Sequence, residues 1–293
     1  MQAKQASLLG FLKNAPQFAI PIYQRTYSWT ERECRQLWND ILRAGREKEV
    51  GAHFVGSVVY IEHGPYQVTD HDPLMVIDGQ QRLTTVCLLL EALARRIGDE
   101  EPADGFSAKK IRTYYLLNDL EEGERAYKLI LTQTDKETLL AILRQKALPK
   151  DSSIRIEQNF EMFVEWFAKL DDDDLSALCL GLSKLLIVDI SLQRQQDNPQ
   201  LIFESMNSTG RELSQADLIR NFILMGLEQV HQTQLYEDHW RPMEVDFGQE
   251  AYGTQFDTFV RHYLTVKTGE IPNKDAVYEA FKAYCNCSGP LSA

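Results

Sequence analysis

The stretch Val76–Thr85, VIDGQQRLTT, joins the apolar end of a strand directly to the start of a helix. A strand at Leu74–Ile77 is predicted from its apolar run, and a helix at Leu83–Ile97 from apolar residues at helical spacing. The first N–H groups of such a helix have no intrahelical partner and point outward. Gly79 allows close backbone approach, and Arg82 is a planar two-pronged donor. Together they predict a phosphate or anion cradle.

Asp78 comes directly before this cradle and has two interpretations. Its carboxylate is placed to hold a Mg²⁺ ion that bridges phosphate oxygens. Alternatively it is an N-cap that satisfies its own helix. The chain has neither a Walker A lysine loop nor a GxGxxG motif, so the common nucleotide-binding motifs are absent.

Strand patterns on both sides of this stretch predict an α+β fold. Extended segments are predicted at Phe18–Tyr23, His53–Ile61 and Leu185–Ser191, whereas residues 99–181 show helical patterns alone. The fold expected is a small mixed-sheet domain with a large helical insertion and a helical C-terminal region. The corresponding boundaries are 1–98 with 183–226 for the discontinuous sheet domain, 99–182 for the insertion and 227–293 for the C-terminal region.

Composition and charge limit the classes of protein to which this chain can belong. The 293 residues are 44% hydrophobic and 25% charged, which is typical of a globular chain. A net charge of −12 disfavours nucleic-acid binding over the whole surface. Residues 1–48 carry eight basic and four acidic side chains, which predicts either a local basic patch for a polyanion or a helix face of ion pairs. Five cysteines without CxxC spacing and no membrane span or signal peptide predict a cytoplasmic protein.

A second polar cluster lies in Phe203–Asn221, FESMNSTGRELSQADLIRN. Short hydroxyl and amide side chains in an irregular loop can bind the sugar, base or phosphate of a nucleotide. The alternative is structural, because Gly210 suits the end of one helix, and Ser214 with Asp217 is a capping box for the next. Both interpretations stay open for this segment.

A third candidate is Pro21–Trp29, PIYQRTYSW, where polar residues and an arginine alternate with aromatic ones. Such a segment can stack on and clamp nucleic acid, or it can be a buried corner between a strand and a helix. We expect Tyr27 and Trp29 to pack in the core and Tyr23, Gln24 and Arg25 to point into a site.

Four segments of the chain resemble the N-terminal domain of GmrSD-type restriction endonucleases, in the order of that family. They are IPIYQRTYSW, HFVGSVVY, VIDGQQRLTT and IFESMNSTGRELSQADLIRN, between residue 18 and about residue 225. The resemblance implies a fold similar to ParB and sulfiredoxin and a role in modification-dependent or phage-directed DNA restriction. It also implies binding and hydrolysis of nucleoside triphosphates with Mg²⁺, beside a separate nuclease domain of the histidine–asparagine–histidine type.

The resemblance also assigns the site residues. The nucleotide loop falls on Asp78, Gly79, Gln80, Gln81 and Arg82. Which residue would orient the attacking water does not follow from the resemblance, and Gln80 or Gln81 is our own hypothesis. Tyr23, Gln24 and Arg25 line the same cleft or sense DNA, and a further loop supplies Asn207, Thr209 and Gly210, followed by Asp217 and Asn221.

Nothing after residue 225 resembles a nuclease, so we expect either an excised N-terminal fragment or a nuclease in a separate subunit. The function expected is a Mg²⁺-dependent nucleoside triphosphatase that gates this nuclease. We also expect it to contact DNA through a local basic patch, and the resemblance implies that this DNA carries a chemical modification. The alternatives are a DNA-binding sensor without hydrolysis and a scaffold that only pairs with a nuclease subunit. No membrane partner is expected, and a homo-oligomer stays open.

Overall fold

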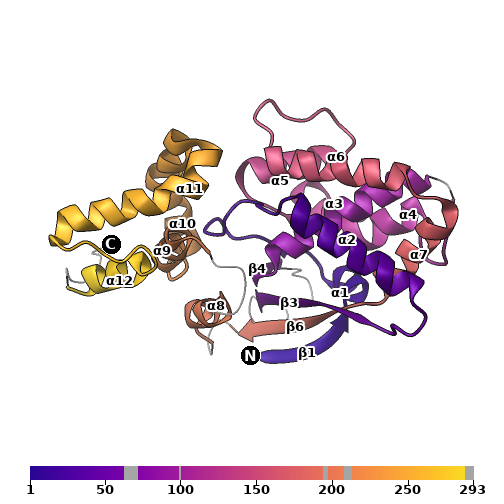
Figure 1. The fold of residues 1–293 in the computed structure, drawn as a ribbon, viewed down its shortest axis with the longest axis horizontal. Helices are drawn as coiled ribbons and strands as arrows, with labels where there is room; N and C mark the ends of the chain where they lie inside the picture. The colour runs from indigo at the N-terminus through magenta and orange to yellow at the C-terminus, as the bar shows by residue number, and fades with distance from the viewer. Residues whose placement is uncertain (63–71, 99, 194–196, 208–212, 288–293) are drawn as a thin grey trace. The chain divides into compact units, whose positions relative to one another are not determined.

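Three strands form the centre of a mixed β-sheet in the computed structural model, which describes residues 1–62, 72–98, 100–193, 197–207 and 213–287 (Figure 1). They are β3 (His53–Glu62), β4 (Leu74–Asp78) and β6 (Leu185–Gln193). β3 pairs antiparallel with β4 and parallel with β6, although β6 follows more than a hundred residues later. The α+β class and these three strands are confirmed.

Three shorter strands complete the sheet in the order β1-β6-β3-β4-β2-β5. β1 (Gln2–Ser7) pairs antiparallel with β6, and β2 (Phe18–Ala19) pairs parallel with both β4 and β5 (Leu129–Ile130). The extended segment predicted at Phe18–Tyr23 is thus a strand for two residues only, and Pro21, which has no N–H, lies beyond its end. The prediction of helices alone over 99–181 is wrong at Leu129–Ile130, because two residues are too few for a periodic pattern.

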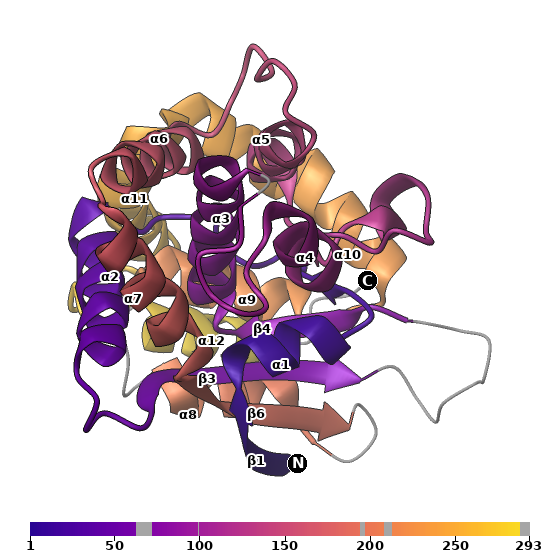
Figure 2. The same cartoon turned by 90° about the vertical axis from the view of Figure 1, so that its right-hand side faces the viewer.

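The helices of the first 197 residues lie mainly to one side of this sheet (Figure 2). α3 (Gln80–Ile97) is buried on almost every face and packs against α6. The other helices of this part of the chain are α1 (Leu8–Asn14), α2 (Glu31–Arg46), α4 (Ala108–Ile111), α5 (Gln133–Leu143), α6 (Ile154–Ala168) and α7 (Asp172–Ser183), with short π and 3₁₀ turns at Arg112–Leu116 and Gly123–Ala126. A central helix buried all round explains why its sequence is apolar well beyond one stripe.

Aromatic packing and a close helix crossing hold these helices together. Phe163 and Phe167 of α6 are fully buried and contact Trp38 of α2. α2 and α7 approach through Gly45 and Gly181. A Cβ atom on Gly45 would lie 1.7 Å from the carbonyl oxygen of Ala177, and one on Gly181 would lie 1.9 Å from that of Ile41.

The chain forms two compact units, and the division differs from the predicted boundaries. One unit comprises Met1–Pro21 with Thr26–Asp197, and the other comprises Ile22–Arg25 with Asn198–Ala293. Residues 99–182 therefore belong with the sheet, and residues 198–226 with the C-terminal helices. No helix among the described residues has the length and apolar character needed to cross a membrane.

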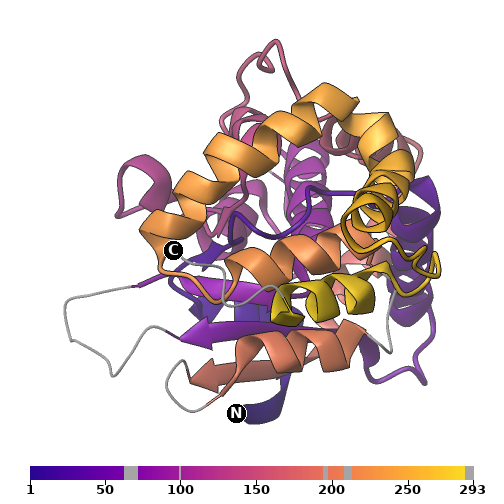
Figure 3. The same ribbon diagram turned by 90° about the vertical axis from the view of Figure 1, so that its left-hand side faces the viewer.

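The second unit is helical. It contains α8 (Pro199–Asn207), α9 (Gln215–Leu224), α10 (Gln229–Leu235), a π turn at Tyr236–Trp240, α11 (Arg241–Thr268) and α12 (Val277–Cys287). α12 packs against α9 and α11 (Figure 3). α11 is kinked at Gly248, whose φ of 74° and ψ of 160° are not helical.

Candidate functional site

The junction between β4 and α3 is built around Gly79. Its φ of 95° is in the left-handed region, which glycine adopts without strain. A Cβ atom there would also lie 3.0 Å from the carbonyl oxygen of Ser57 and 3.1 Å from Cγ2 of Val58, so the turn packs tightly onto β3. Gly79 is itself the N-cap of α3, and no side chain caps this helix. The alternative that Asp78 is the N-cap is therefore not what the structure shows.

Arg82 lies in a recess that β3 forms by an irregularity in its backbone. The pairing of β3 with β6 shifts register between Phe54 and Ser57, and Gly56 within this shift has a φ of 109°. Nη1 of Arg82 donates to the Ser57 carbonyl at 2.6 Å, and a Cβ atom on Gly56 would lie 2.5 Å from Nη2. Gly56 is thus the residue that makes room for the guanidinium, and sequence reasoning missed it.

The electrostatics of the recess come from Arg82 and Asp78, both half-buried. Burial lowers the pKa of the Arg82 guanidinium, and the nearby Asp78 carboxylate opposes that shift. A cation held by a backbone oxygen at the start of a helix, with a carboxylate close by, can bind an anion together with a metal cation. Asp78, Gly79 and Arg82 are thus brought together in one place.

Gln80 and Gln81, the other two residues of the motif, are both buried. Oε1 of Gln81 accepts from the backbone N–H of Ser28 at 2.8 Å and of Trp29 at 3.3 Å, and Nε2 donates to the carbonyl of Thr26 at 3.2 Å. Gln81 therefore fastens the segment Thr26–Trp29 to the first turn of α3. The backbone carbonyl of Gln80 accepts from the Thr84 hydroxyl at 2.9 Å.

The same segment is held in the core through Tyr27. Its hydroxyl pairs with Thr85 Oγ1 at 2.7 Å and accepts from Asn159 Nδ2 at 3.0 Å. Its backbone N–H donates to Oδ2 of Asp135 at 2.6 Å. Trp29 is half-buried against the core, so the prediction that Tyr27 and Trp29 pack inward is confirmed. Asn159 and Asp135 come from helices far away in sequence, and no local pattern marked either of them.

Asp135 is a buried carboxyl group, and its Oδ1 has no hydrogen-bond partner among the residues that the structure describes. Burial raises its pKa to about 6, and the hydrogen bonds from Ser153 and the Tyr27 backbone only partly oppose this. In an unfolded chain the pKa is about 3.9. The folded chain thus keeps this proton to a higher pH than the unfolded chain does. The free energy of unfolding therefore falls as the pH rises from about 4 to about 6.

Asp135→Asn should remove this dependence, because asparagine resembles the neutral carboxyl at every pH. We expect the variant to match the wild type near pH 4.5 and to exceed it at pH 8 by about 2 kcal/mol in free energy of unfolding. Urea titrations across this range measure the difference, with the exposed residue changed in Asp173→Asn as the control for a lost carboxylate. A constant offset between wild type and Asp135→Asn across the range would refute the prediction.

The Tyr23–Arg25 segment of the third candidate and helix α9 of the second candidate both belong to the second unit. Tyr23 and Gln24 are buried and Arg25 is half-buried. Nε of Arg220, on α9, donates to the carbonyl oxygen of Tyr23 at 2.9 Å. Arg220 also pairs with Asp217 at 2.9 Å and with Glu244 of α11. Arg220, which was not among the expected site residues, is therefore the link between the Tyr23–Arg25 segment and α9.

The polar atoms of Asp217 have hydrogen-bond partners, whereas one polar atom of Asn221 has none among the described residues. The Ser214 hydroxyl accepts from the Asp217 backbone N–H at 3.0 Å, which confirms the predicted helix start, while the Asp217 carboxylate binds Arg220. Asn221 is buried, and its Oδ1 is without a hydrogen-bond partner in the described part of the chain. Asn207 is the last residue of α8, and Thr209 and Gly210 lie outside the described residues.

The basic N-terminal segment forms the ion-paired helix face that was one of the two expectations. Arginines of α2 pair with acidic neighbours: Arg32 with Glu33, Arg35 with Glu31, Arg43 with Asp40 and Arg46 with Asp174. These exposed pairs leave little unbalanced positive charge on α2.

The donor set at Asp78 limits what metal could bind there. The described residues contain no group of three or more His, Cys, Asp or Glu side chains placed to hold a metal ion. A single carboxylate suits Mg²⁺, which is usually bound by one or two carboxylates together with phosphate oxygens and water. Asp78 therefore fits Mg²⁺ that arrives with a nucleotide, and does not fit a metal site made of protein ligands alone.

The chain thus combines an α+β fold with a helix that begins after a left-handed glycine, beside an arginine and a carboxylate. The family described as the GmrSD restriction endonuclease, N-terminal domain, matches residues 8–224 of this chain. The chain belongs to this family, and it is a component of a restriction system of a kind in which this domain works with a nuclease domain or subunit. No curated protein matches the chain.

Proposed function

We propose that this chain binds and hydrolyses nucleoside triphosphates and thereby regulates the nuclease of its restriction system. The observation that supports the proposal best is the start of α3. An 18-residue helix begins at a left-handed glycine without a side-chain cap, with Arg82 and Asp78 on either side of the turn. A helix N-terminus carries partial positive charge and unpaired N–H groups, and both favour phosphate.

The roles of the residues follow from this geometry. The first-turn backbone amides and the guanidinium edge of Arg82 bind phosphate oxygens, while the Ser57 carbonyl holds Nη1 of Arg82 in place. Asp78 would hold Mg²⁺, which neutralises charge on the phosphate oxygens when bound. Arg82 is thus positioned before the ligand arrives, which reduces the entropy cost of binding.

Hydrolysis in this site would rest on position and charge. Water attacks the terminal phosphorus, the bond from that phosphorus to the bridging oxygen breaks, and the nucleoside diphosphate and inorganic phosphate leave. Arg82 stabilises the negative charge that develops on the bridging and equatorial oxygens. Because the amide of Gln81 is engaged with the backbone of Thr26–Trp29, we assign Gln81 a positioning role rather than the orientation of water.

Regulation would pass through the segment that Gln81 holds. Thr26–Trp29 is anchored to α3, and Thr26 is bonded directly to Arg25, which belongs to the second unit. A change at the phosphate site can thus reach the Tyr23–Arg25 segment and, through the Tyr23 carbonyl, Arg220 and α9. In this proposal Tyr23, Gln24 and Arg25 together with Asn207, Thr209, Gly210, Asp217 and Asn221 respond to nucleotide or modified DNA and transmit the state to the nuclease.

Asp78→Asn tests the hydrolytic part of the proposal. With the carboxylate replaced by a neutral amide, we expect phosphate release to fall about 100-fold and the Mg²⁺ concentration for half-maximal activity to rise. Phosphate release by the purified chain is measured with each of the four nucleoside triphosphates across a Mg²⁺ series, with and without DNA. Asp72→Asn, an exposed aspartate outside the motif, is the matched control and should behave as wild type.

Other outcomes would point to the rival functions. Absence of release from a folded wild-type chain, with DNA affinity that falls steeply with salt, would replace the triphosphatase by a DNA sensor. Absence of release, nucleotide binding and DNA binding would leave a scaffold for a nuclease subunit. The net charge of −12 and the paired arginines of α2 favour nucleotide over DNA as the polyanion.

A further inference from the structure

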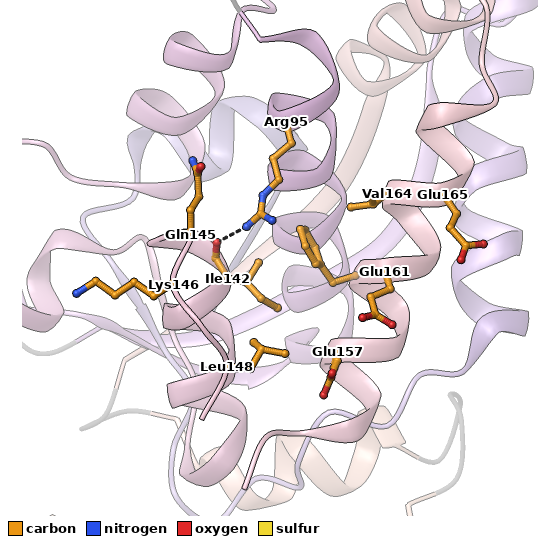
Figure 4. A pocket seen from close by; sticks show the side chains of 10 residues that line it. Arg95, Ile142, Gln145, Lys146, Leu148, Glu157, Glu161, Val164 and Glu165 are labelled. Atoms are coloured by element: carbon orange, nitrogen blue, oxygen red, sulfur yellow. Dashed lines mark hydrogen bonds between the residues drawn. The ribbon is translucent and has the colours of Figure 1, made fainter. Parts of the chain in front are cut away.

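A groove in the first unit lies away from the β4–α3 junction and has no part in the function proposed above. It has a volume of about 650 Å³ and runs between α6 and the end of α5 with the residues that follow it. Figure 4 shows Arg95 of α3 pointing into this groove from above, with the α6 residues on one side of it. A groove of this size between helices can take a side of another helix.

The floor of the groove is apolar. Ile142 and Phe160 are buried, whereas Leu148 and Val164 are 36% and 39% exposed. An apolar strip that opens to water in this way resembles the centre of a protein–protein interface.

Arg95 does not make the groove positive. Its Nε donates to the fully buried Glu91 carboxylate at 2.9 Å, and its Nη2 donates to the Ile142 carbonyl at 2.6 Å. Its guanidinium also lies over the Phe160 ring, 4.6 Å from the ring centre. Two N–H donors of Arg95 are therefore used inside the protein, and its partner Glu91 is shared with Arg112. Lys146 also lines the groove, on the side opposite the α6 residues in Figure 4.

The acidic side chains that line the groove lie on one wall. Glu157, Glu161 and Glu165 follow one another at four-residue spacing along α6, so they share one face over about 12 Å. Ser152 donates a hydrogen bond to Glu157, but no ion pair within the described residues engages any of the three. Like charges at this spacing destabilise a helix slightly. Glu157 offsets part of that cost, because it lies in the first turn of α6 and accepts from Ser152.

We propose that this groove binds a basic amphipathic helix of a partner protein. The apolar face of the partner helix would cover Leu148, Val164 and Phe160. Lysine or arginine side chains at four-residue spacing along one edge would meet the glutamate row. Phosphate-bearing partners are disfavoured, because the same row would repel them. The overall charge of −12 would speed the approach of a cationic helix.

A synthetic helix tests this proposal directly. The probe is a fluorescein-labelled peptide of about 16 lysine and leucine residues with leucine at helical spacing, titrated with the full chain in fluorescence anisotropy. A scrambled peptide of equal composition has no apolar face. We expect the amphipathic peptide to bind about tenfold more tightly than the scrambled one, and increased salt to weaken this binding.

Two sets of variants locate the binding. The triple variant Glu157→Gln, Glu161→Gln, Glu165→Gln should bind the amphipathic peptide about tenfold more weakly than the wild type. The matched triple Glu121→Gln, Glu122→Gln, Asp173→Asn removes the same charge from exposed positions elsewhere and should change affinity less than about twofold. Glu161→Lys with Glu165→Lys should reverse the preference, so that a glutamate–leucine peptide binds instead.

Three results would overturn the proposal. Equal binding of the scrambled peptide, or equal loss in both triple variants, would mean that net charge alone attracts the probe. Self-association of the chain that the Glu157, Glu161 and Glu165 triple variant abolishes would make a second copy of this chain the occupant. Nucleotide binding should be the same in all of these variants, so that this test and the test of the phosphate site fail independently.

Discussion

Replacing Arg82 by alanine is expected to weaken nucleotide binding about 100-fold, the loss for one or two hydrogen bonds between a guanidinium and phosphate. Arg82 is the one side chain of the β4–α3 junction that combines positive charge with a fixed position. Its Nη1 is tied to the Ser57 carbonyl and its planar group lies against Gly56. The change should cost little stability, because Ser57, whose carbonyl loses its donor, is only half-buried.

Nucleotide affinity in this experiment is measured by isothermal titration calorimetry, and urea unfolding confirms that the variant is folded. Arg82→Lys keeps the charge but not the two-pronged geometry, and should bind between wild type and Arg82→Ala. Arg32→Ala removes an arginine of the same unit that is 83% exposed, and should bind as wild type. Unchanged affinity in folded Arg82→Ala would remove the β4–α3 junction as the phosphate site.

Local sequence patterns were sufficient to predict the strands and the helix that position the β4–α3 junction. β3, β4 and β6 are runs of β-branched and apolar residues, and α3 has strong helical periodicity, so each was predicted within a few residues of its bounds. Asp78-Gly79 identified the turn, because it lies where the strand pattern ends and the helical pattern begins. The location of the candidate site could therefore be predicted from the sequence.

The surroundings of the junction were not predictable, since they depend on contacts between distant segments. The recess for Arg82 requires the left-handed Gly56, and that glycine has meaning only through the register of β3 against β6. The role of Gln81 depends on Ser28, 53 residues away, and Tyr27 is held by Asp135, 108 residues away. The membership of Ile22–Arg25 in the second unit likewise has no local signal.

Arg220 is the clearest example of a residue whose role depends on contacts between distant segments. We expect its replacement to lower the free energy of unfolding more than any other change predicted here. It is only 1% exposed and lies between the Asp217 and Glu244 carboxylates, with Tyr252 and the Tyr23 carbonyl also in contact. Burial alone would lower the pKa of Arg220, but these partners outweigh it and shift the pKa upward. Arg220→Met is expected to destabilise the second unit by about 3 to 5 kcal/mol, because two buried carboxylates lose their counterion.

Hydrogen exchange of the segments 215–224 and 256–264 measures this loss within the second unit, while exchange in α3 should be unchanged if the units unfold independently. The combined variant Arg220→Met, Asp217→Asn, Glu244→Gln should recover much of the stability, since no charge is then buried without a partner. Lys282→Met, which removes a less buried ion-paired cation of the same unit, is the matched control with a loss of at most about 1 kcal/mol. If the combined variant were no more stable than Arg220→Met, the loss would lie in the bond to the Tyr23 carbonyl. Arg220 would then hold the Tyr23–Arg25 segment in place rather than balance buried charge.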